Sequence, residues 1–192
     1  MVYIAALPKG AARRLEHRAG WALLRSGLIR QGFCGREETV EGLMARAQKG
    51  EHGKPCLPGG PQFSISHSRG LIACAVEREP VGLDIERVRE FSLGMIERIC
   101  TPGERLLTGG DPGQLTQLWT CKESYMKLTG RGLSQGLHAS EFIRLGERPE
   151  MAVEGPRFYS AAIEHAGQEF RLTLCSYVPG DFRTEWTDYS DL

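Results

Sequence analysis

Residues 111–130 read DPGQLTQLWTCKESYMKLTG, and this stretch predicts one long helix. Asp111 is a typical N-cap, Pro112 suits the first helical position, and Gly130 is a typical stop. At 100° per residue one stripe of the helix is apolar and is formed by Leu115, Leu118, Trp119 and Met126. We therefore expect the helix to pack by one face on a core.

Lys122 falls near the middle of the apolar stripe, with Glu123 and Lys127 on its flank. A lysine in such a stripe is costly unless an anion meets it. Glu123 and Lys127 are four residues apart, and a surface ion pair is the simple interpretation of that spacing. This interpretation leaves Lys122 without a partner.

Outside this helix, short β-prone runs alternate with helical runs. We predict strands over residues 2–7, 62–67, 71–77, 81–87, 141–145, 158–165 and 169–177. We predict helices over residues 9–29, 37–49 and 91–107, the last with a break near residues 101–102. Residues 50–61 predict a loop, and the residues after 177 a surface-lying or frayed tail. Helices followed by an antiparallel meander thus occur twice.

The strand predicted over residues 81–87 carries two acids on one face. Leu83 and Ile85 point to one side, and Asp84 and Glu86 share the other, with Cα atoms ~6.6 Å apart. Two carboxylates side by side repel, whereas Mg²⁺ binds one or two carboxylates together with water and phosphate oxygens. The alternative is that the acids mark the solvent face of an edge strand.

Two further segments carry groups that suit a phosphate. Residues 63–68 read FSISHS, and Ser66, His67 and Ser68 place two hydroxyls and an imidazole at a strand end. A structural or solvent-exposed His67 is the alternative. Lys54 precedes Pro55, which makes its backbone extended, but no Walker sequence surrounds it.

Composition narrows the classes of partner. The 192 residues hold 24 Lys+Arg and 24 Asp+Glu, so no global field attracts nucleic acid or an anionic membrane. The six cysteines form no C-x-x-C pair and indicate reduced, buried thiols. No apolar run approaches the ~18 residues of a membrane span. We expect a cytoplasmic protein.

The N-terminal region carries a local excess of positive charge. Residues 1–30 have an excess of five (6 − 1), since Glu16 stands against Lys9, Arg13, Arg14, Arg18, Arg25 and Arg30. A solvated helix face is one interpretation of such a run, and an anion site is the other.

In their order along the chain, four segments resemble the 4′-phosphopantetheinyl transferases, in the larger type that activates peptide and polyketide synthetases. The segments are Gly53-Lys54-Pro55, residues 63–68, residues 82–86 and residues 119–133. The pattern W-x-x-K-E-S-x-x-K-x-x-G-x-G-L with D-I-E upstream is specific. The resemblance implies an α+β pseudo-dimer of two similar halves, here residues 1–88 and 89–192, with the active site between them.

The same resemblance implies a reaction. Members transfer the 4′-phosphopantetheine arm of coenzyme A to a serine of an apo acyl or peptidyl carrier protein, with Mg²⁺, and release adenosine 3′,5′-bisphosphate. Asp84, Glu86 and Glu123 match the family's magnesium ligands. Glu123 is the base expected for the carrier serine, and Asp84, Glu123 and Lys127 are the expected catalytic residues. Two halves in one chain make a monomer sufficient.

The expected cofactor contacts follow by position. Lys127 matches the lysine at the pyrophosphate, with Lys122 as a second candidate there. Ser66 and His67 match the segment at the coenzyme's phosphates, and Lys54 the loop that lines the nucleotide. The 3′-phosphate is expected to meet Arg14 or Arg18, while Lys9 and Arg13 stay candidates.

Two other classes of function remain open. One is a carrier-protein or nucleotide-binding module with the same fold and no transfer activity. The other is a Mg²⁺-dependent hydrolase of nucleotide pyrophosphates, which would be expected to carry a helix such as R-E-x-x-E-E. Glu97-Arg98 is the nearest match to that pattern.

Overall fold

The computed structural model describes residues 1–8, 10, 13–180 and 183–192 and has the expected mixed α+β content. The helices are α1 (Arg13–Arg30), α2 (Val40–Arg46), α3 (Leu93–Ile99), α4 (Pro102–Thr108), α5 (Pro112–Thr129), η1 (Gly132–Gln135) and η2 (Tyr189–Asp191). The strands are β1 (Val2–Ala6), β2 (Gln48–Lys49), β3 (Pro55–Cys56), β4 (Gln62–Ser68), β5 (Leu71–Glu77), β6 (Val81–Arg87), β7 (Phe142–Arg144), β8 (Glu150–Met151), β9 (Arg157–His165), β10 (Gln168–Ser176) and β11 (Thr184–Trp186).

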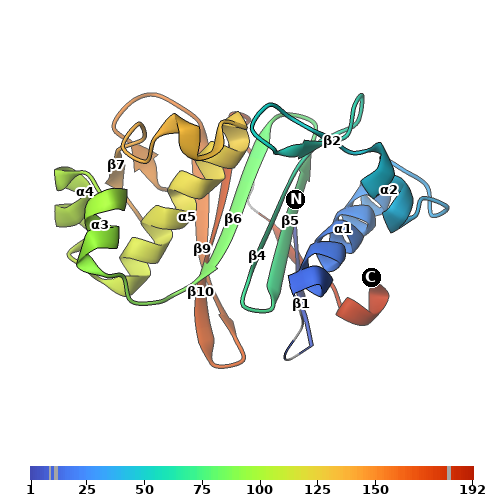
Figure 1. Ribbon diagram of the computed structural model, residues 1–192, viewed down its shortest axis with the longest axis horizontal. Coiled ribbons are helices and arrows are strands. Elements are labelled where there is room, and N and C mark those ends of the chain that lie inside the picture. The colour runs from blue at the N-terminus through green and yellow to red at the C-terminus, as the bar shows by residue number, and fades with distance from the viewer. Residues whose placement is uncertain (9, 11–12, 181–182) are drawn as a thin grey trace.

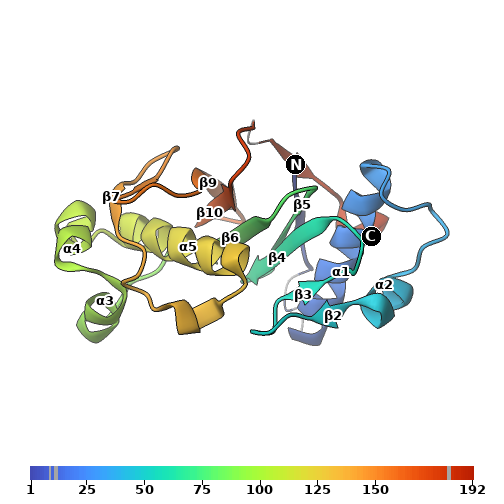
Figure 2. The same cartoon turned by 90° about the horizontal axis from the view of Figure 1, so that it is seen from above.

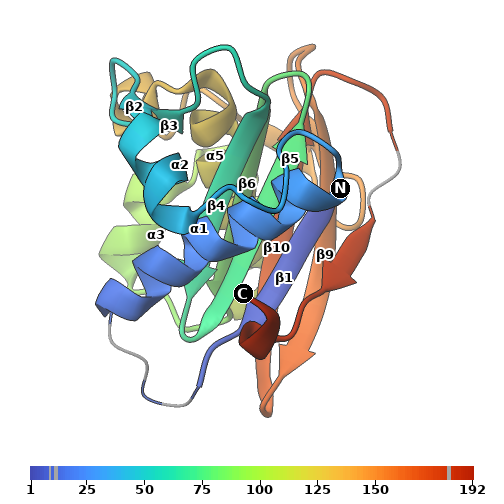
Figure 3. The same ribbon diagram turned by 90° about the vertical axis from the view of Figure 1, so that its right-hand side faces the viewer.

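Two sheets, each covered by a long helix, make up most of the molecule (Figure 1). The first sheet has the order β11-β1-β5-β4, and α1 lies across it, as Figure 3 shows. The second has the order β6-β10-β9 and is packed against α5. Trp21 of α1 and Phe63 of β4 meet edge to face in the core of the first unit.

An apolar core also joins the two sheets to each other. Ile4 of β1 and Ala73 of β5 belong to the same buried cluster as Leu83 and Ile85 of β6 and Leu172 of β10. The face of β6 that the sequence assigned to Leu83 and Ile85 therefore packs inward. Asp84 and Glu86 lie on the opposite face, as predicted.

Hydrogen-bonded strands cross the expected boundary at residue 88 twice. β6 precedes that boundary but pairs with β10, where Asp84 lies opposite Thr173. β11, near the C-terminus, pairs in parallel with β1. The predicted meander of three consecutive strands is wrong for the third strand, because β6 joins the other sheet instead of pairing with β5.

In the tail, residues 184–192 lie on the surface and are not frayed. Its strand β11 is exposed but hydrogen-bonded to β1, and Thr187 donates its N–H to the Ile4 carbonyl at 2.8 Å. Tyr189 and Leu192 pack against the core of the first unit. A second difference is that α2 ends at Arg46, because residues 48–49 pair with β3 instead of continuing the helix.

Helix α5 has the ends that the sequence predicted. Asp111 accepts the N–H of Gln114 at 2.8 Å, and Gly130 ends the helix with φ of 70°. The helix lies directly along β6, as seen from above in Figure 2. Gly82 permits this approach, since a Cβ there would lie 2.6 Å from the Leu128 nitrogen and closer still to the Ser124 carbonyl oxygen.

Two broader expectations concern membrane-spanning segments and the relation between the two units. No helix in the described part of the chain is long and apolar enough to cross a membrane. The correspondence of the two units as halves of a pseudo-dimer stays a prediction.

Candidate active site

The acidic face of β6 meets helix α5. Asp84 is 3% exposed and accepts two hydrogen bonds at its Oδ1 atom, one from Lys127 Nζ and one from Ser66 Oγ, both at 2.7 Å. Glu86 accepts a hydrogen bond from Ser68 Oγ at 2.7 Å. These acids therefore do not form a solvent-exposed face.

Glu123 and Lys127 project from α5 toward the same point. Lys127 forms its ion pair with Asp84, so the simple i,i+4 surface pair with Glu123 does not describe it. Burial raises the pKa of Glu123, and the negative charges of Asp84 and Glu86 raise it further, while Lys127 lowers it. Burial likewise raises the pKa of Glu86, against a lowering by the Ser68 hydrogen bond. The three carboxylates therefore act on one another electrostatically around one ammonium.

These acids have the donor chemistry of a hard divalent cation. Among the described residues, no three His, Cys, Asp or Glu side chains are gathered as a set of metal ligands. Asp84 nevertheless keeps its Oδ2 atom buried and without a hydrogen-bond partner in the described part of the chain. A buried carboxylate oxygen without a donor is costly unless a cation or a donor meets it. The carboxylates thus fit Mg²⁺ in chemistry.

A cavity of about 250 Å³ opens beside this group and is walled by both units. Phe63 of β4 and the loop residue Lys54 line one side, and Glu123 and Lys127 of α5 line the other. An adjoining hollow of about 390 Å³ shares Lys54 and Phe63 with it and extends toward Arg131. The cavity is therefore lined by residues of both units.

Lys54 brings a second ammonium to the cleft. Its Nζ atom donates to the Val81 carbonyl at 2.9 Å. Burial lowers its pKa to about 8, and the positive charge of Lys127 contributes to the lowering. Two ammonium groups that repel each other across a cleft favour an anion between them.

The expected cluster of Ser66, His67 and Ser68 is divided by the strand. Successive side chains of β4 point to opposite faces. Ser66 and Ser68 therefore contact Asp84 and Glu86, while His67 is exposed on the other face, 3.4 Å from the Glu16 carboxylate of α1. The prediction of one hydroxyl–imidazole group at a strand end is wrong for this reason.

Arg14 and Arg18 of α1 are exposed. Arg18 forms an ion pair with Glu41 of α2 at 2.6 Å, and Arg14 lies in the first turn of α1, beside the turn that brings Glu16 to His67. Lys9 lies outside the described residues. For Arg13 the structure describes only its place as the first residue of α1.

Lys122 is not at the cleft. Its side chain is 1% exposed and lies 2.8 Å from Glu104 of α4, and its Nζ atom also donates to the carbonyls of Leu137 at 2.6 Å and Ser140 at 3.0 Å. An ammonium has three hydrogens, and all three are directed at protein oxygens. The expectation that Lys122 binds the cofactor is therefore wrong, although the expected anionic partner exists.

Two sets of contacts were not predicted from the sequence: those of Glu104, and those of Ser66 and Ser68 with the acids of β6. Glu104 also accepts the N–H groups of Thr101 and Phe142 at 2.9 Å, so it joins α4, α5 and β7. The spacing Thr101-x-x-Glu104 is that of a capping box and carries a signal in the sequence. For the contacts of Ser66 with Asp84 and of Ser68 with Glu86, the signal is that the serines and the acids both repeat every second residue.

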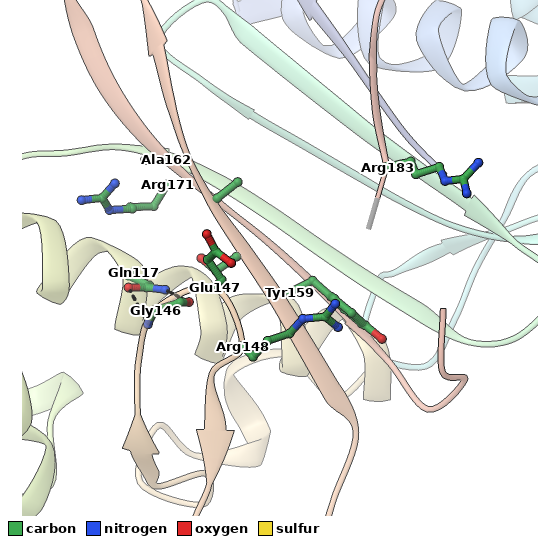
Figure 4. A pocket seen from close by; sticks show the side chains of 10 residues that line it. Gln117, Gly146, Glu147, Arg148, Tyr159, Ala162, Arg171 and Arg183 are labelled. Atoms are coloured by element: carbon green, nitrogen blue, oxygen red, sulfur yellow. Dashed lines mark hydrogen bonds between the residues drawn. The ribbon is translucent and has the colours of Figure 1, made fainter. Parts of the chain in front are cut away.

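A larger cavity lies elsewhere in the described part of the chain. It measures about 860 Å³, is lined by β9, β10, residues 146–148 and Arg183, and contains none of the predicted site residues (Figure 4). Its arginines do not converge: Arg171 pairs with Glu169 at 2.7 Å, and Arg148 stacks on Tyr159. Of the predicted site residues, Lys54, Glu123 and Lys127 line the smaller cleft instead.

A cleft lined by Glu123 and two lysines, with Asp84 paired to one of those lysines, is suited to an enzyme that handles a polyphosphate and a divalent cation. Comparisons with known proteins identify the family. The model of the 4′-phosphopantetheinyl transferase superfamily matches residues 80–175. The chain belongs to that superfamily and is a transferase.

Individual relatives extend the match beyond residues 80–175. The 4′-phosphopantetheinyl transferase Sfp of Bacillus subtilis (strain 168) is 32% identical, over 97% of this chain and 88% of its own length. Another 4′-phosphopantetheinyl transferase of Bacillus subtilis is 34% identical, over 67% of this chain and 62% of its own length. The 4′-phosphopantetheinyl transferase HetI of Nostoc sp. is 34% identical, over 62% of this chain and 55% of its own length.

Proposed function

We propose that this chain transfers the 4′-phosphopantetheine arm of coenzyme A to a serine of an apo acyl or peptidyl carrier protein and releases adenosine 3′,5′-bisphosphate. One observation carries the proposal: Lys127 of α5 is paired with Asp84 of β6, and beside this pair Glu123 and Lys127 line a cleft between two units. These residues are far apart in the sequence. Three carboxylates that repel one another do not stabilise the fold, so their proximity favours a functional role.

The cleft residues bind the coenzyme's pyrophosphate. Lys127 and Lys54 supply fixed positive charge to it. Asp84, Glu86 and Glu123 are the residues that would hold Mg²⁺, and the bound ion would supply positive charge to the pyrophosphate oxygens. Arg14 and Arg18, in the first turns of α1, are the candidates for the 3′-phosphate, with Lys9 and Arg13 as alternatives. For Arg18 this requires that its exposed ion pair with Glu41 opens, which costs little. His67 of β4, beside Glu16 of α1, is a candidate contact of the coenzyme's phosphates.

Glu123 is the candidate to take the proton of the carrier serine, directly or through a water molecule. Burial and the neighbouring acids raise its pKa in the metal-free protein, which favours this role, whereas a bound Mg²⁺ would make its carboxylate a weaker base. The serine oxygen attacks the phosphorus of the phosphopantetheine arm, and the phosphorus–oxygen bond to the leaving bisphosphate breaks. Lys127 stabilises the negative charge that develops on the leaving oxygen.

We infer further that the chain works as a cytoplasmic monomer whose two units are the halves of a pseudo-dimer. Each unit contains three antiparallel strands, β1-β5-β4 or β6-β10-β9, covered by one long helix, α1 or α5, which supports the inference. Both walls of the cleft come from one chain, so no second copy is needed to complete it.

Mass spectrometry of an apo carrier protein tests the proposal. With coenzyme A, Mg²⁺ and this protein, the carrier is expected to gain the mass of one phosphopantetheine arm. Glu123→Gln should slow this gain by about 10²–10⁴-fold, since general base catalysis contributes that much. Glu97→Gln, at an exposed position of α3, is the control and should leave the rate unchanged.

Other results select other functions. Cleavage of coenzyme A without a carrier would indicate a hydrolase. Binding of coenzyme A with neither transfer nor cleavage would indicate a binding module. Equal transfer by Glu123→Gln and the unchanged protein would remove Glu123 from the reaction.

A further inference from the structure

β4 and β6 lie side by side although they belong to different sheets. Each is the edge strand of its own sheet, and no backbone ladder joins them in the described part of the chain. The N–H groups of an edge strand that point away from its sheet still need acceptors when they are buried. The junction of β4 and β6 therefore needs other hydrogen bonds.

Three serines of β4 supply these acceptors. Ser64 Oγ accepts the N–H of Leu83 at 3.0 Å, and Ser66 Oγ accepts that of Ile85 at 3.3 Å. Ser68 Oγ accepts the N–H of Arg87 at 3.2 Å. The hydroxyls repeat every second residue, as do the N–H groups of β6. We call Ser64, Ser66 and Ser68 the serine ladder.

A hydroxyl that accepts one bond still has one proton to donate. Ser66 donates its proton to Asp84 Oδ1 and Ser68 donates its proton to Glu86 Oε2, both at 2.7 Å. Ser64 faces no carboxylate, and its oxygen lies 3.4 Å from the Leu83 carbonyl. Ser66 and Ser68 thus each bind a backbone N–H of β6 and the side chain of the acid that precedes that N–H in the sequence. Ser64 binds only backbone groups.

We propose that Ser68 is a positioning residue that orients the Glu86 carboxylate for the divalent cation, as Ser66 does for Asp84. This inference rests on the proposed function. Glutamate has three side-chain torsions to restrain, so an unrestrained Glu86 samples many rotamers. The hydrogen bond from Ser68 selects one of them. Hydrogen bonds of this kind, behind the direct ligands, typically change metal affinity 10–100-fold.

Ser64→Ala and Ser68→Ala form a matched pair. Both serines are buried, at 4% and 8% exposure, and both accept one N–H of β6. Each substitution therefore leaves one strand N–H without its acceptor, and both should lower the melting temperature by similar amounts. Only Ser68→Ala also frees a carboxylate.

Binding of Mn²⁺, a hard cation that replaces Mg²⁺, provides the direct measurement. Free Mn²⁺ is followed by electron paramagnetic resonance in titrations of the whole chain with coenzyme A present. Ser68→Ala should raise the dissociation constant for Mn²⁺ about 10-fold, whereas Ser64→Ala should not change it. Ser68→Thr, which keeps the hydroxyl, should restore most of the affinity. The Mg²⁺ concentration for half-maximal transfer should shift in the same order.

Each result decides one question. Equal Mn²⁺ affinity in Ser64→Ala and Ser68→Ala would overturn the positioning role while leaving the metal site intact, provided that Glu86→Gln still weakens binding. Absence of Mn²⁺ binding to the unchanged protein would overturn the metal site and the positioning role together. If Ser68→Ala does not fold, Ser68→Cys, which keeps the size but is a weak donor, carries the same comparison.

Discussion

Lys54 stands apart from the other basic side chains because it is largely buried at the cleft. With its pKa lowered to about 8, it loses its charge over a pH range in which exposed lysines stay protonated. The depressed pKa has two opposite consequences. Between about pH 8 and the ordinary lysine value the unfolded chain binds more protons, so the contribution of Lys54 to stability rises with pH. Affinity for an anion falls over the same range, because the charge is lost.

We therefore expect kcat/KM for coenzyme A to fall as the pH rises through about 8. The reason is that kcat/KM reports the ionisation of the free enzyme, in which burial and Lys127 hold the pKa of Lys54 low. Lys54→Gln should lower kcat/KM at pH 7 and flatten the profile between pH 7 and 9. Rate measurements across this range check it. A fall of the same size in Lys54→Gln would assign the titration to another group.

At the level of single residues, the residues of the candidate site could be predicted from the sequence, but the residues that they contact could not. Alternation alone placed Asp84 and Glu86 on one face of a strand, and the helical stripe flagged Lys122 as a buried cation in need of an anion. The identity of that anion, Glu104, depends on how α4 folds back on α5, which no local pattern encodes. For the same reason the contact of Ser68 with Glu86 could not be predicted, since it depends on how two sheets meet.

Lys122 and Lys127 of helix α5 form ion pairs with different parts of the molecule. Lys127 faces the cleft, and Lys122 joins the helix to α4 through a fully buried pair with Glu104. Removing one partner of a buried pair typically costs about 3–5 kcal/mol because the other charge is left uncompensated.

Lys122→Met should therefore lower the free energy of unfolding by about 3–5 kcal/mol. Adding Glu104→Gln should recover part of that loss, since Gln removes the orphaned charge and keeps an acceptor for the Phe142 N–H. Urea unfolding of both variants measures this. Full stability of Lys122→Met combined with loss of transfer would return Lys122 to the reaction.

The contact of α5 with β6 depends on Gly82. A Cβ at this position would meet the helix backbone, so Gly82→Ala must push α5 away from β6. Overpacking of this kind typically costs about 1–3 kcal/mol. The shift also separates Glu123 and Lys127 from Asp84, and a misplacement of about 1 Å can cost about 10²-fold in rate.

We expect Gly82→Ala to lose about 10²-fold in transfer rate per folded molecule. Gly94→Ala is the control, because a Cβ there would meet open space on the exposed helix α3. Circular dichroism gives the folded fraction, and carrier mass gives the rate. Unchanged transfer in folded Gly82→Ala would show that the spacing of α5 and β6 does not set the geometry of the site.

Elements bounded by local signals were predicted well, and their partners were not. α5 has its cap at Asp111 and its stop at Gly130, and β4, β5 and β6 begin where the sequence placed them. The pairing of β6 with β10 and of β11 with β1 was missed, because period-two alternation identifies a strand but not its neighbour. β11 was also hidden by its exposed, polar side chains, which resemble those of a loop.

The two units of the whole molecule share more than the cleft. Their sheets meet through a buried apolar cluster in which Val2 and Ile4 of β1 and Leu71 of β5 face Leu83, Ile85 and Leu172 of the second sheet. β11 returns from the second unit to extend the first sheet. Neither sheet can therefore lose its partner without exposing core side chains to water, at roughly 25 cal/mol per Å² of apolar surface.

The shared core predicts that the chain unfolds in one cooperative transition rather than as two domains. In calorimetry the van't Hoff and calorimetric enthalpies should agree, as they do for two-state unfolding. Ile4→Ala, a truncation in the first sheet, should cost about 2–5 kcal/mol and lower the melting temperature of the whole chain. Tryptophan fluorescence separates the alternatives, because Trp21 lies in the first unit and Trp119 in the second. In a Trp186→Phe background, which removes the third tryptophan, Trp119→Phe and Trp21→Phe each report on one unit, and the two melting curves should shift together when Ile4→Ala is added. A transition that moves only for the Trp21 unit would show that the halves unfold independently, and the geometry of the cleft between them would then have to be maintained by the bound substrate.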